Sequence, residues 1–197
     1  MTTVNMIKNV YSIGFVLFIA TMVVFLGMYF FGMNTEYFNN SLLLNAFFMP
    51  VIYLAGAYVS VNSLRRAGIR MGFRDAFGRA FKPMFFGGFL SVIGMYLFLN
   101  FADPGAKDLL NFQYIERQKT ELDAEYNKAK QFVKTPEEKA ELEKKYQERK
   151  LSFSPEMIKG KDMFNFRQFT YYFAAILVFY VILSTFFASF FRSRSEL

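Results

Sequence analysis

The side chains that usually carry out chemistry in proteins are few in this sequence, and two kinds are missing. The chain has no Cys and no His, which excludes disulfides, thiol nucleophiles, imidazole bases and metal sites built from those ligands. The remaining acids are Asp75, Asp103 and carboxylates in residues 103–167 that alternate with Lys, as is typical of a solvated helix face. We therefore expect no catalytic residues, no metal ligands and no cofactor, and predict that the protein is not an enzyme.

The most concentrated charge is a basic linker at residues 64–82, which contains six cations, one acid and several apolar side chains. Because Arg and Lys reach lipid phosphates while Phe enters the acyl boundary, this pattern predicts contact with anionic lipids. Ordinary positive-inside anchoring explains the same pattern. Without a nucleic-acid-binding fold, nucleic acid is not an expected partner. The candidate lipid-contacting residues are Arg65, Arg66, Arg70, Arg74, Arg79 and Lys82.

Four uncharged apolar runs must position these polar segments. They cover residues 10–33, 41–63, 83–102 and 169–191. Each reaches the roughly 20 residues needed to cross about 30 Å of hydrocarbon, so the sequence predicts an all-α polytopic membrane protein with four transmembrane helices. The first run is longer than the apolar core of a signal peptide, and we expect it to be retained. In the linker we expect an irregular turn around Gly68–Gly72 and a helix from about Phe73 that continues into the third span.

The distribution of Lys and Arg predicts the orientation. Residues 1–9, the linker at 64–82 and the tail with Arg192 and Arg194 are basic, whereas the short segment 34–40 contains no cation. Since an excess of Lys and Arg in short loops marks the inside, we predict a bacterial inner-membrane protein with both termini in the cytoplasm. Residues 103–167 then lie in the periplasm.

This periplasmic segment has the pattern of a helical hairpin. Asp103-Pro104 and Thr135-Pro136 each combine an N-cap residue with Pro at the first helical position, and apolar residues between and after them recur at helical spacing up to about Leu151. The simplest interpretation is that this stripe packs the two arms together. The alternative is that its aromatic residues form a docking surface for another protein. Those residues are Tyr114, Tyr126, Phe132 and Tyr146.

Within the four apolar runs there is no ionisable residue, so the sequence contains no obvious proton relay or ion path. Small residues four positions apart permit close helix contact, and Asn can form hydrogen bonds across helices. Pro50 should bend the second span and free a backbone carbonyl group. The residues expected at helix contacts are Asn45, Pro50, Gly56, Ser60, Asn62, Gly87 and Ser91.

Several short motifs follow one another along almost the whole chain. They are Tyr11-Ser12-Ile13-Gly14, Gly72-Phe73-Arg74-Asp75-Ala76-Phe77, Ala80-Phe81-Lys82, Asp103-Pro104 and Ser154-Pro155. In this order and spacing the chain resembles the DUF4199 family of small four-span membrane proteins, known mainly from Bacteroidetes. The resemblance implies the fold and topology but no catalytic residues. One departure is the end of the last span, Phe190-Phe191 followed by Arg192-Ser193-Arg194, where family members often have small residues and a Lys-rich tail.

These features divide the chain into residues 1–102 with three spans and the linker, residues 103–167 with the extracytoplasmic hairpin, and residues 168–197 with the fourth span and tail. Two functions remain open. The first is a non-enzymatic accessory subunit that packs against a larger inner-membrane protein, with the hairpin as a contact arm. The alternative is a small transporter or flippase component for lipids or polyprenyl-phosphate-linked molecules. Either protein could form a homo-oligomer.

Overall fold

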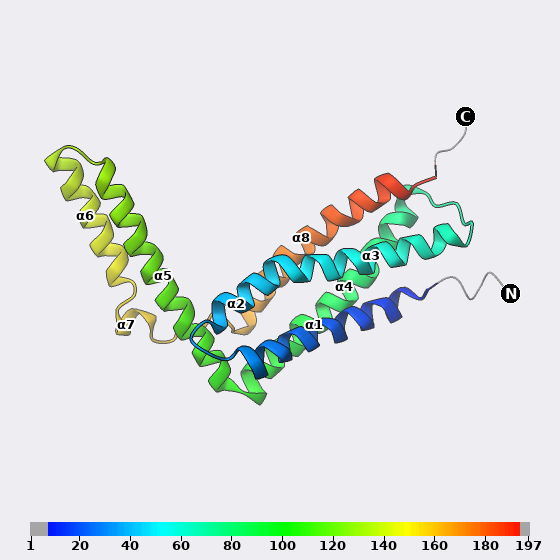
Figure 1. The fold of residues 1–197 in the computed structure, drawn as a ribbon, viewed down its shortest axis with the longest axis horizontal. Helices are drawn as coiled ribbons and strands as arrows, with labels where there is room; N and C mark the ends of the chain where they lie inside the picture. Colours follow the sequence, from blue (N-terminus) through cyan, green and yellow to red (C-terminus); the bar gives the residue numbers. More distant parts are fainter. Residues whose placement is uncertain (1–7, 194–197) are drawn as a thin grey trace.

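The protein is described by a computed structural model over residues 8–193 (Figure 1). The first span is α1 (Val10–Gly32), and the fourth is α8 (Phe166–Phe191). The second span comprises α2 (Tyr37–Leu43), the π-helical turn η2 (Leu44–Phe48) and α3 (Met49–Arg66). The third comprises α4 (Phe73–Leu97) and the π-helical turn η3 (Phe98–Ala102). Between the third and fourth spans lie α5 (Pro104–Phe132), α6 (Pro136–Leu151) and the short α7 (Pro155–Ile158). No strand occurs in this part of the chain. The prediction of an all-α multi-pass membrane protein with four spans is confirmed. The predictions for residues 1–7 and Arg194 concern residues outside the described range.

The helices extend beyond the uncharged runs from which the spans were predicted. The second span begins at Tyr37 and ends at Arg66, and α8 begins at Phe166. Polar residues at the ends of these runs therefore continue the helices. The predicted turn before Phe73 is present, with Gly68 at φ +73°, a conformation that glycine adopts without steric cost. From Phe73, α4 runs through Pro83 into the third span.

The third span is the central element of the bundle, because α4 contacts α1, α3 and α8. Small residues on α4 allow this close packing, and Ala76, Ala80, Gly87 and Ser91 are all buried. At the crossing with α1, a Cβ atom built on Gly87 would lie 2.7 Å from the carbonyl oxygen of Gly14. The two backbones are therefore in direct contact there, as small residues permit between membrane helices.

The outside of the four-helix bundle is apolar. Large hydrophobic side chains are exposed on every span, and Phe31, Phe47, Phe101 and Phe190 are each at least 70% exposed. A continuous surface of this kind is unfavourable in water. Lipid around the helices would remove these side chains from water, which is consistent with four membrane spans.

The two ends of the bundle differ in structure. The start of α1, the linker between α3 and α4, and the end of α8 lie together at one end, called here the linker end (Figure 1). At the other end, the hairpin end, α5 and α6 leave the bundle as an antiparallel pair (Figure 1). With 29 residues, α5 is about 44 Å long. The predicted hairpin between the third and fourth spans is thus present.

Candidate functional site

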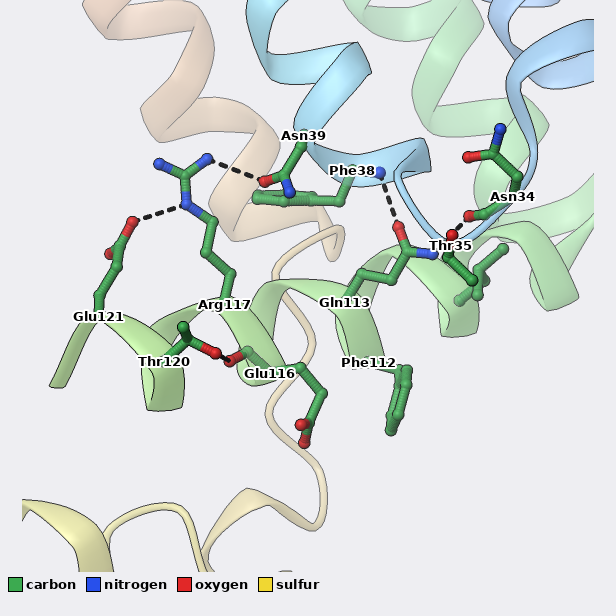
Figure 2. Close-up of a pocket in the computed structure, with 11 residues that line it drawn as sticks. Asn34, Thr35, Phe38, Asn39, Phe112, Gln113, Glu116, Arg117, Thr120 and Glu121 are labelled. Atoms are coloured by element: carbon green, nitrogen blue, oxygen red, sulfur yellow. Dashed lines mark hydrogen bonds and ion pairs between the residues drawn. The ribbon is translucent and has the colours of Figure 1, made fainter. Parts of the chain in front are cut away.

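The foot of the hairpin, residues 103–117, is attached by side-chain hydrogen bonds to the turn between α1 and α2 and to the start of α2 (Figure 2). Gln113 on α5 accepts a 2.7 Å hydrogen bond from the backbone N–H of Phe38 and donates one of 2.7 Å to the carbonyl oxygen of Asn34. One turn further along α5, Arg117 donates to Asn39 over 3.2 Å and forms an ion pair with Glu121 at 2.7 Å. These bonds hold α5 against the short turn between α1 and α2.

Asp103 connects the start of α5 to α1. Its carboxylate accepts a 2.8 Å hydrogen bond from the Tyr29 hydroxyl and caps α5 by accepting from the Ala106 N–H at 3.2 Å. The sequence predicted this N-cap, but the bond to Tyr29 links residues 74 positions apart and has no local signal. The hydrogen bond from Tyr29 and that from Ala106 lower the pKa of the Asp103 carboxyl group, since both favour its charged form.

A second polar cluster attaches α5 to the segment before α8. Lys107 and Asp162 form an ion pair at 3.1 Å with side chains 19% and 27% exposed. Lys107 also donates to Asn100 at 3.2 Å, and Asp162 accepts from Asn111 at 3.1 Å and from the Phe164 N–H at 2.8 Å. Burial raises the pKa of the Asp162 carboxyl group, but these hydrogen bonds and the Lys107 charge outweigh it, so its pKa lies below the ordinary value.

Beside this foot lies an open groove of about 620 Å³ (Figure 2). Phe38, Leu109 and Phe112 supply its apolar lining, and Gln113 and Arg117 supply polar groups. The hydrogen bonds already described use these two polar side chains to hold the helices together. The arrangement therefore serves to orient the hairpin on the bundle, and it contains no nucleophile–base pair.

The distal half of the hairpin is held together by its own side chains. Tyr126 on α5 and Tyr146 on α6 stack with ring centroids 4.2 Å apart. Their hydroxyl groups donate across the pair, that of Tyr126 to Glu143 and that of Tyr146 to Asp123 at 2.7 Å. At the turn, Thr135 and Glu138 form a capping box, and the Thr135 N–H is the main cause that lowers the pKa of the Glu138 carboxyl group. This half is a two-helix unit with its own contacts.

The four aromatic residues considered for partner binding do not form one surface. Tyr126 and Tyr146 face each other, as described. Tyr114 is half-buried and packs edge-to-face on Phe38 of α2 with centroids 5.7 Å apart. Phe132 is 80% exposed near the tip of the hairpin. Only this last residue has a ring that is free to contact another molecule.

Of the residues predicted at helix contacts, Gly56 and Ser60 contact a neighbouring helix, whereas Asn45 forms a hydrogen bond within its own span. Leu17 of α1 packs directly on Gly56, where an added Cβ atom would lie 2.8 Å from its methyl groups, and the Ser60 hydroxyl donates to the Arg79 carbonyl oxygen at 2.6 Å. Asn62 is half-buried. Asn45 is exposed and donates to the Ser41 carbonyl oxygen of its own span at 2.8 Å, so it makes no bond across helices here.

Pro50 lies two residues after the π-helical turn η2 ends at Phe48. It has no backbone N–H, so the turn before it lacks one of the usual helical hydrogen bonds. The second span is therefore locally widened at Leu44–Phe48, which is where the sequence predicted a bend.

Buried hydroxyl groups meet in the middle of the bundle, and the sequence alone did not indicate this cluster. The Tyr53 hydroxyl lies 3.2 Å from that of Thr21 and 3.4 Å from that of Ser91, and the Tyr53 ring stacks on Tyr180 at 5.2 Å. Together with Asn45 they border a cavity of about 180 Å³. The Thr21 and Ser91 hydroxyls donate to the carbonyl oxygens of Leu17 and Gly87, each at 2.8 Å. The Tyr53 hydroxyl can therefore donate to one of these two hydroxyls at a time, which stabilises the contact between spans.

The six cations of the linker region also separate into groups. Arg79 points inward and donates to the carbonyl oxygens of Lys8 and Ser60 at 2.8 and 3.2 Å and to the Ser63 hydroxyl at 2.9 Å. Arg65 lies over the Phe191 ring at 5.6 Å. The other four side chains are exposed; they are Arg66, Arg70, Arg74 and Lys82.

Across residues 8–193, no group of three or more Asp or Glu side chains is arranged to hold a metal ion. The polar clusters described above instead join helices to one another.

Comparison with known proteins identifies the family of this chain. The profile of the family described as "Protein of unknown function (DUF4199)" matches residues 12–193, which is nearly the whole chain, in agreement with the resemblance seen in the short motifs. No curated protein and no solved structure matches the chain.

Proposed function

Because the chain belongs to the DUF4199 family, whose description assigns no activity, we propose a function from the geometry alone: the protein is a non-enzymatic accessory subunit of a larger bacterial inner-membrane protein. The hairpin is its main contact arm, and the lipid-facing sides of the spans are additional contact surfaces. In the proposed orientation both termini are cytoplasmic and the hairpin is periplasmic. Both a single copy and a homo-oligomer of the protein are compatible with such a complex.

The observation that supports this proposal is the contrast between the two halves of the hairpin. Its foot is fixed to the spans by Asp103, Lys107, Gln113 and Arg117. Among the described residues, the side-chain pairs of its distal half stay within the hairpin, and one of them joins Arg149 of α6 to Glu125 of α5 at 2.8 Å. A fixed foot sets the direction of the arm, and a folded distal half presents a defined surface away from the membrane. Such preorganisation reduces the entropy lost on binding.

The proposed orientation can be tested by thiol labelling, because the chain has no Cys. Lys128→Cys places a thiol on the exposed side of the distal hairpin, and Ile69→Cys places one in the linker, where Ile69 is 43% exposed. In cells with a permeabilised outer membrane, a membrane-impermeant maleimide should label the first variant and not the second. After the inner membrane is lysed, both should react. The reverse pattern in intact cells would contradict the orientation.

The accessory role can be tested by shortening the arm. Removing residues 126–148 and joining Glu125 to Arg149 through Gly-Ser-Gly should be tolerated, because these two side chains already pair across the helices. The shortened protein should still insert and purify as a single species, since the foot is intact. It should lose a stoichiometric larger membrane protein that the full chain retains in a pulldown from native membranes. Retention of every copurifying protein would contradict the role of the arm.

A point variant gives a finer comparison. Phe132→Ser changes the free ring near the tip, and Phe112→Ser changes a ring that is 61% exposed at the foot. If the distal half carries the contact, only Phe132→Ser should reduce the amount of partner recovered, by about tenfold for an aromatic anchor at an interface. If the full chain purifies alone, the transporter or flippase alternative becomes the better explanation.

A further inference from the structure

At the linker end, a cleft of about 590 Å³ gathers four of the six cations. Arg70 lies in the turn between α3 and α4, and Arg74, Arg79 and Lys82 lie in α4. Of the residues that the structure describes, Asp75 alone adds a carboxylate to the lining of the cleft; it accepts from the Gly72 N–H at 3.3 Å and so caps α4. Among residues 8–193, none of the four cations forms an ion pair. Among the described residues, the cleft therefore has an excess of positive charge, with four cations and the single carboxylate of Asp75.

The backbone around this cleft is held in a defined shape. Met71 is 2% exposed, and its N–H donates to the Ser193 hydroxyl at 3.1 Å while its carbonyl oxygen accepts from the Ser193 N–H at 2.8 Å. These bonds fasten the linker to the end of α8. The hydrogen bonds of Arg79 to Lys8, Ser60 and Ser63 join α1 and α3 on the other side.

Gly78 keeps space between two of the cations. Arg74, Gly78 and Lys82 follow one another at four-residue spacing, so they lie on one face of α4. A Cβ atom built on Gly78 would have a single neighbour within 4 Å, the Cε atom of Lys82 at 3.9 Å. An anionic group of the size of a phosphate could lie over this glycine with one cation on each side.

Apolar rings extend from the cleft into the membrane-spanning part of α4. Phe77 and Phe81 line the cleft and stack at 5.6 Å, and Phe81 stacks on Phe85 at 5.7 Å. Phe85 is 38% exposed. A ligand with a phosphate head and a long hydrocarbon chain matches both parts of this arrangement, whereas a soluble phosphate would use only the cationic part.

We propose that this cleft binds the phosphate of an anionic phospholipid between Arg70, Arg74 and Lys82, with the acyl chain lying along Phe77, Phe81 and Phe85. Arg79 is a positioning residue that shapes the cleft through its bonds to α1 and α3. Arg65 and Arg66 do not line the cleft, so they contribute only general attraction to the membrane surface. The proposal is independent of whether the hairpin binds a partner.

The test uses tryptophan fluorescence, because the chain has no Trp. Phe81→Trp places a single reporter in the cleft, and Phe31→Trp places one on the lipid-facing surface of α1, where Phe31 is 92% exposed. Each protein is reconstituted with brominated phosphatidylglycerol or brominated phosphatidylcholine. Quenching of the tryptophan at position 81 should show that phosphatidylglycerol binds at least about fivefold more strongly than phosphatidylcholine, as expected from one surface cation or more. The reporter at position 31 should show no preference.

Three variants on the Phe81→Trp background separate a site from general charge. Arg70→Gln/Arg74→Gln should abolish the preference. Gly78→Leu should also abolish it without changing any charge, because the Leu side chain fills the space between the cations. Arg65→Gln/Arg66→Gln removes the same charge outside the cleft and should leave the preference within twofold. Helical content and gel-filtration profile check that each variant is folded.

The outcomes that overturn the proposal are distinct. If Arg70→Gln/Arg74→Gln and Arg65→Gln/Arg66→Gln reduce the preference for phosphatidylglycerol equally and Gly78→Leu does not reduce it, only the general positive charge attracts the lipid. A preference that survives Arg70→Gln/Arg74→Gln would place the lipid elsewhere. Thermal stabilisation by inorganic phosphate in phosphatidylcholine, removed by Gly78→Leu and without a lipid preference, would assign the cleft to a soluble anion. If the reporter itself disturbs the cleft, native mass spectrometry of the Trp-free protein should still show retained phosphatidylglycerol that Gly78→Leu removes.

Discussion

Gly87→Leu should destabilise the protein by at least about 3 kcal/mol, because it forces apart two helices whose backbones touch. A Cβ atom at this position would lie 2.7 Å from the Gly14 carbonyl oxygen and 2.8 Å from the Leu17 Cβ atom. The first of these neighbours is backbone and cannot move without moving α1. Unfolding in a mixed-micelle denaturant titration, followed by circular dichroism, measures the free energy directly.

Gly27→Leu is the matched control. Gly27 lies in α1, the helix that Gly87 of α4 contacts, and an added Cβ atom on Gly27 meets nothing within 4 Å. The same chemical change should therefore alter the free energy of unfolding by no more than about 0.5 kcal/mol. Gly87→Ala should have an intermediate effect. If Gly87→Leu unfolds at the same denaturant concentration as the unmodified protein, the close crossing of α1 and α4 is wrong.

Asp162→Ala should loosen the foot of the hairpin. It leaves Lys107 without its carboxylate, and it leaves the Asn111 side chain and the Phe164 N–H without an acceptor. Unpaired polar groups of this kind cost about 1–3 kcal/mol, and since the pair is partly exposed the loss should fall below that of a fully buried ion pair. Hydrogen exchange should accelerate in residues 104–113 and 159–165 by about tenfold or more.

The control is Glu141→Ala, which removes an ion pair with Lys145 whose side chains are 65% and 67% exposed. Such surface pairs contribute little, so hydrogen exchange at the foot should not change. If Asp162→Ala leaves the foot as protected from hydrogen exchange as before, other contacts hold the hairpin in place. The proposed function would then lose its support from the attachment of the foot to the spans.

The same site should respond to acid. The pKa values of the Asp103 and Asp162 carboxyl groups lie below their ordinary value of 3.8. Because the folded state favours the charged form, their contribution to stability is complete above that value and is lost as the pH falls through the folded-state pKa. Relative to the intrinsic exchange rate at each pH, protection of the foot should therefore fall below about pH 4, and Asp162→Ala should flatten this dependence.

Local sequence was sufficient for the elements of this protein. The lengths of the apolar runs predicted four spans, and Asp103-Pro104 and Thr135-Pro136 predicted where α5 and α6 begin. Caps, proline and helical periodicity act within a few residues, so their effect can be recognised without knowledge of the rest of the chain. The same holds for the turn before Phe73, where Gly68 adopts a left-handed conformation.

The functional clusters could not be predicted in this way. Lys107 and Asp162 are 55 positions apart, and Tyr29 and Asp103 are 74 positions apart, so nothing in the local pattern pairs them. Of six similar cations, only the fold directs Arg79 inward and places Arg70, Arg74 and Lys82 around one cleft. Likewise, the Tyr11-Ser12-Ile13-Gly14 motif marked Gly14 but did not indicate that it packs against Gly87.

The sequence by itself thus determined that the protein crosses a membrane four times and carries a helical hairpin, because hydrophobic length and helix capping are local properties. Only the tertiary structure decided which faces of the helices meet, which aromatic rings stay free and which cations share a site. The physical reason is that these outcomes depend on contacts between distant residues, and a helical pattern specifies a face without specifying its neighbour.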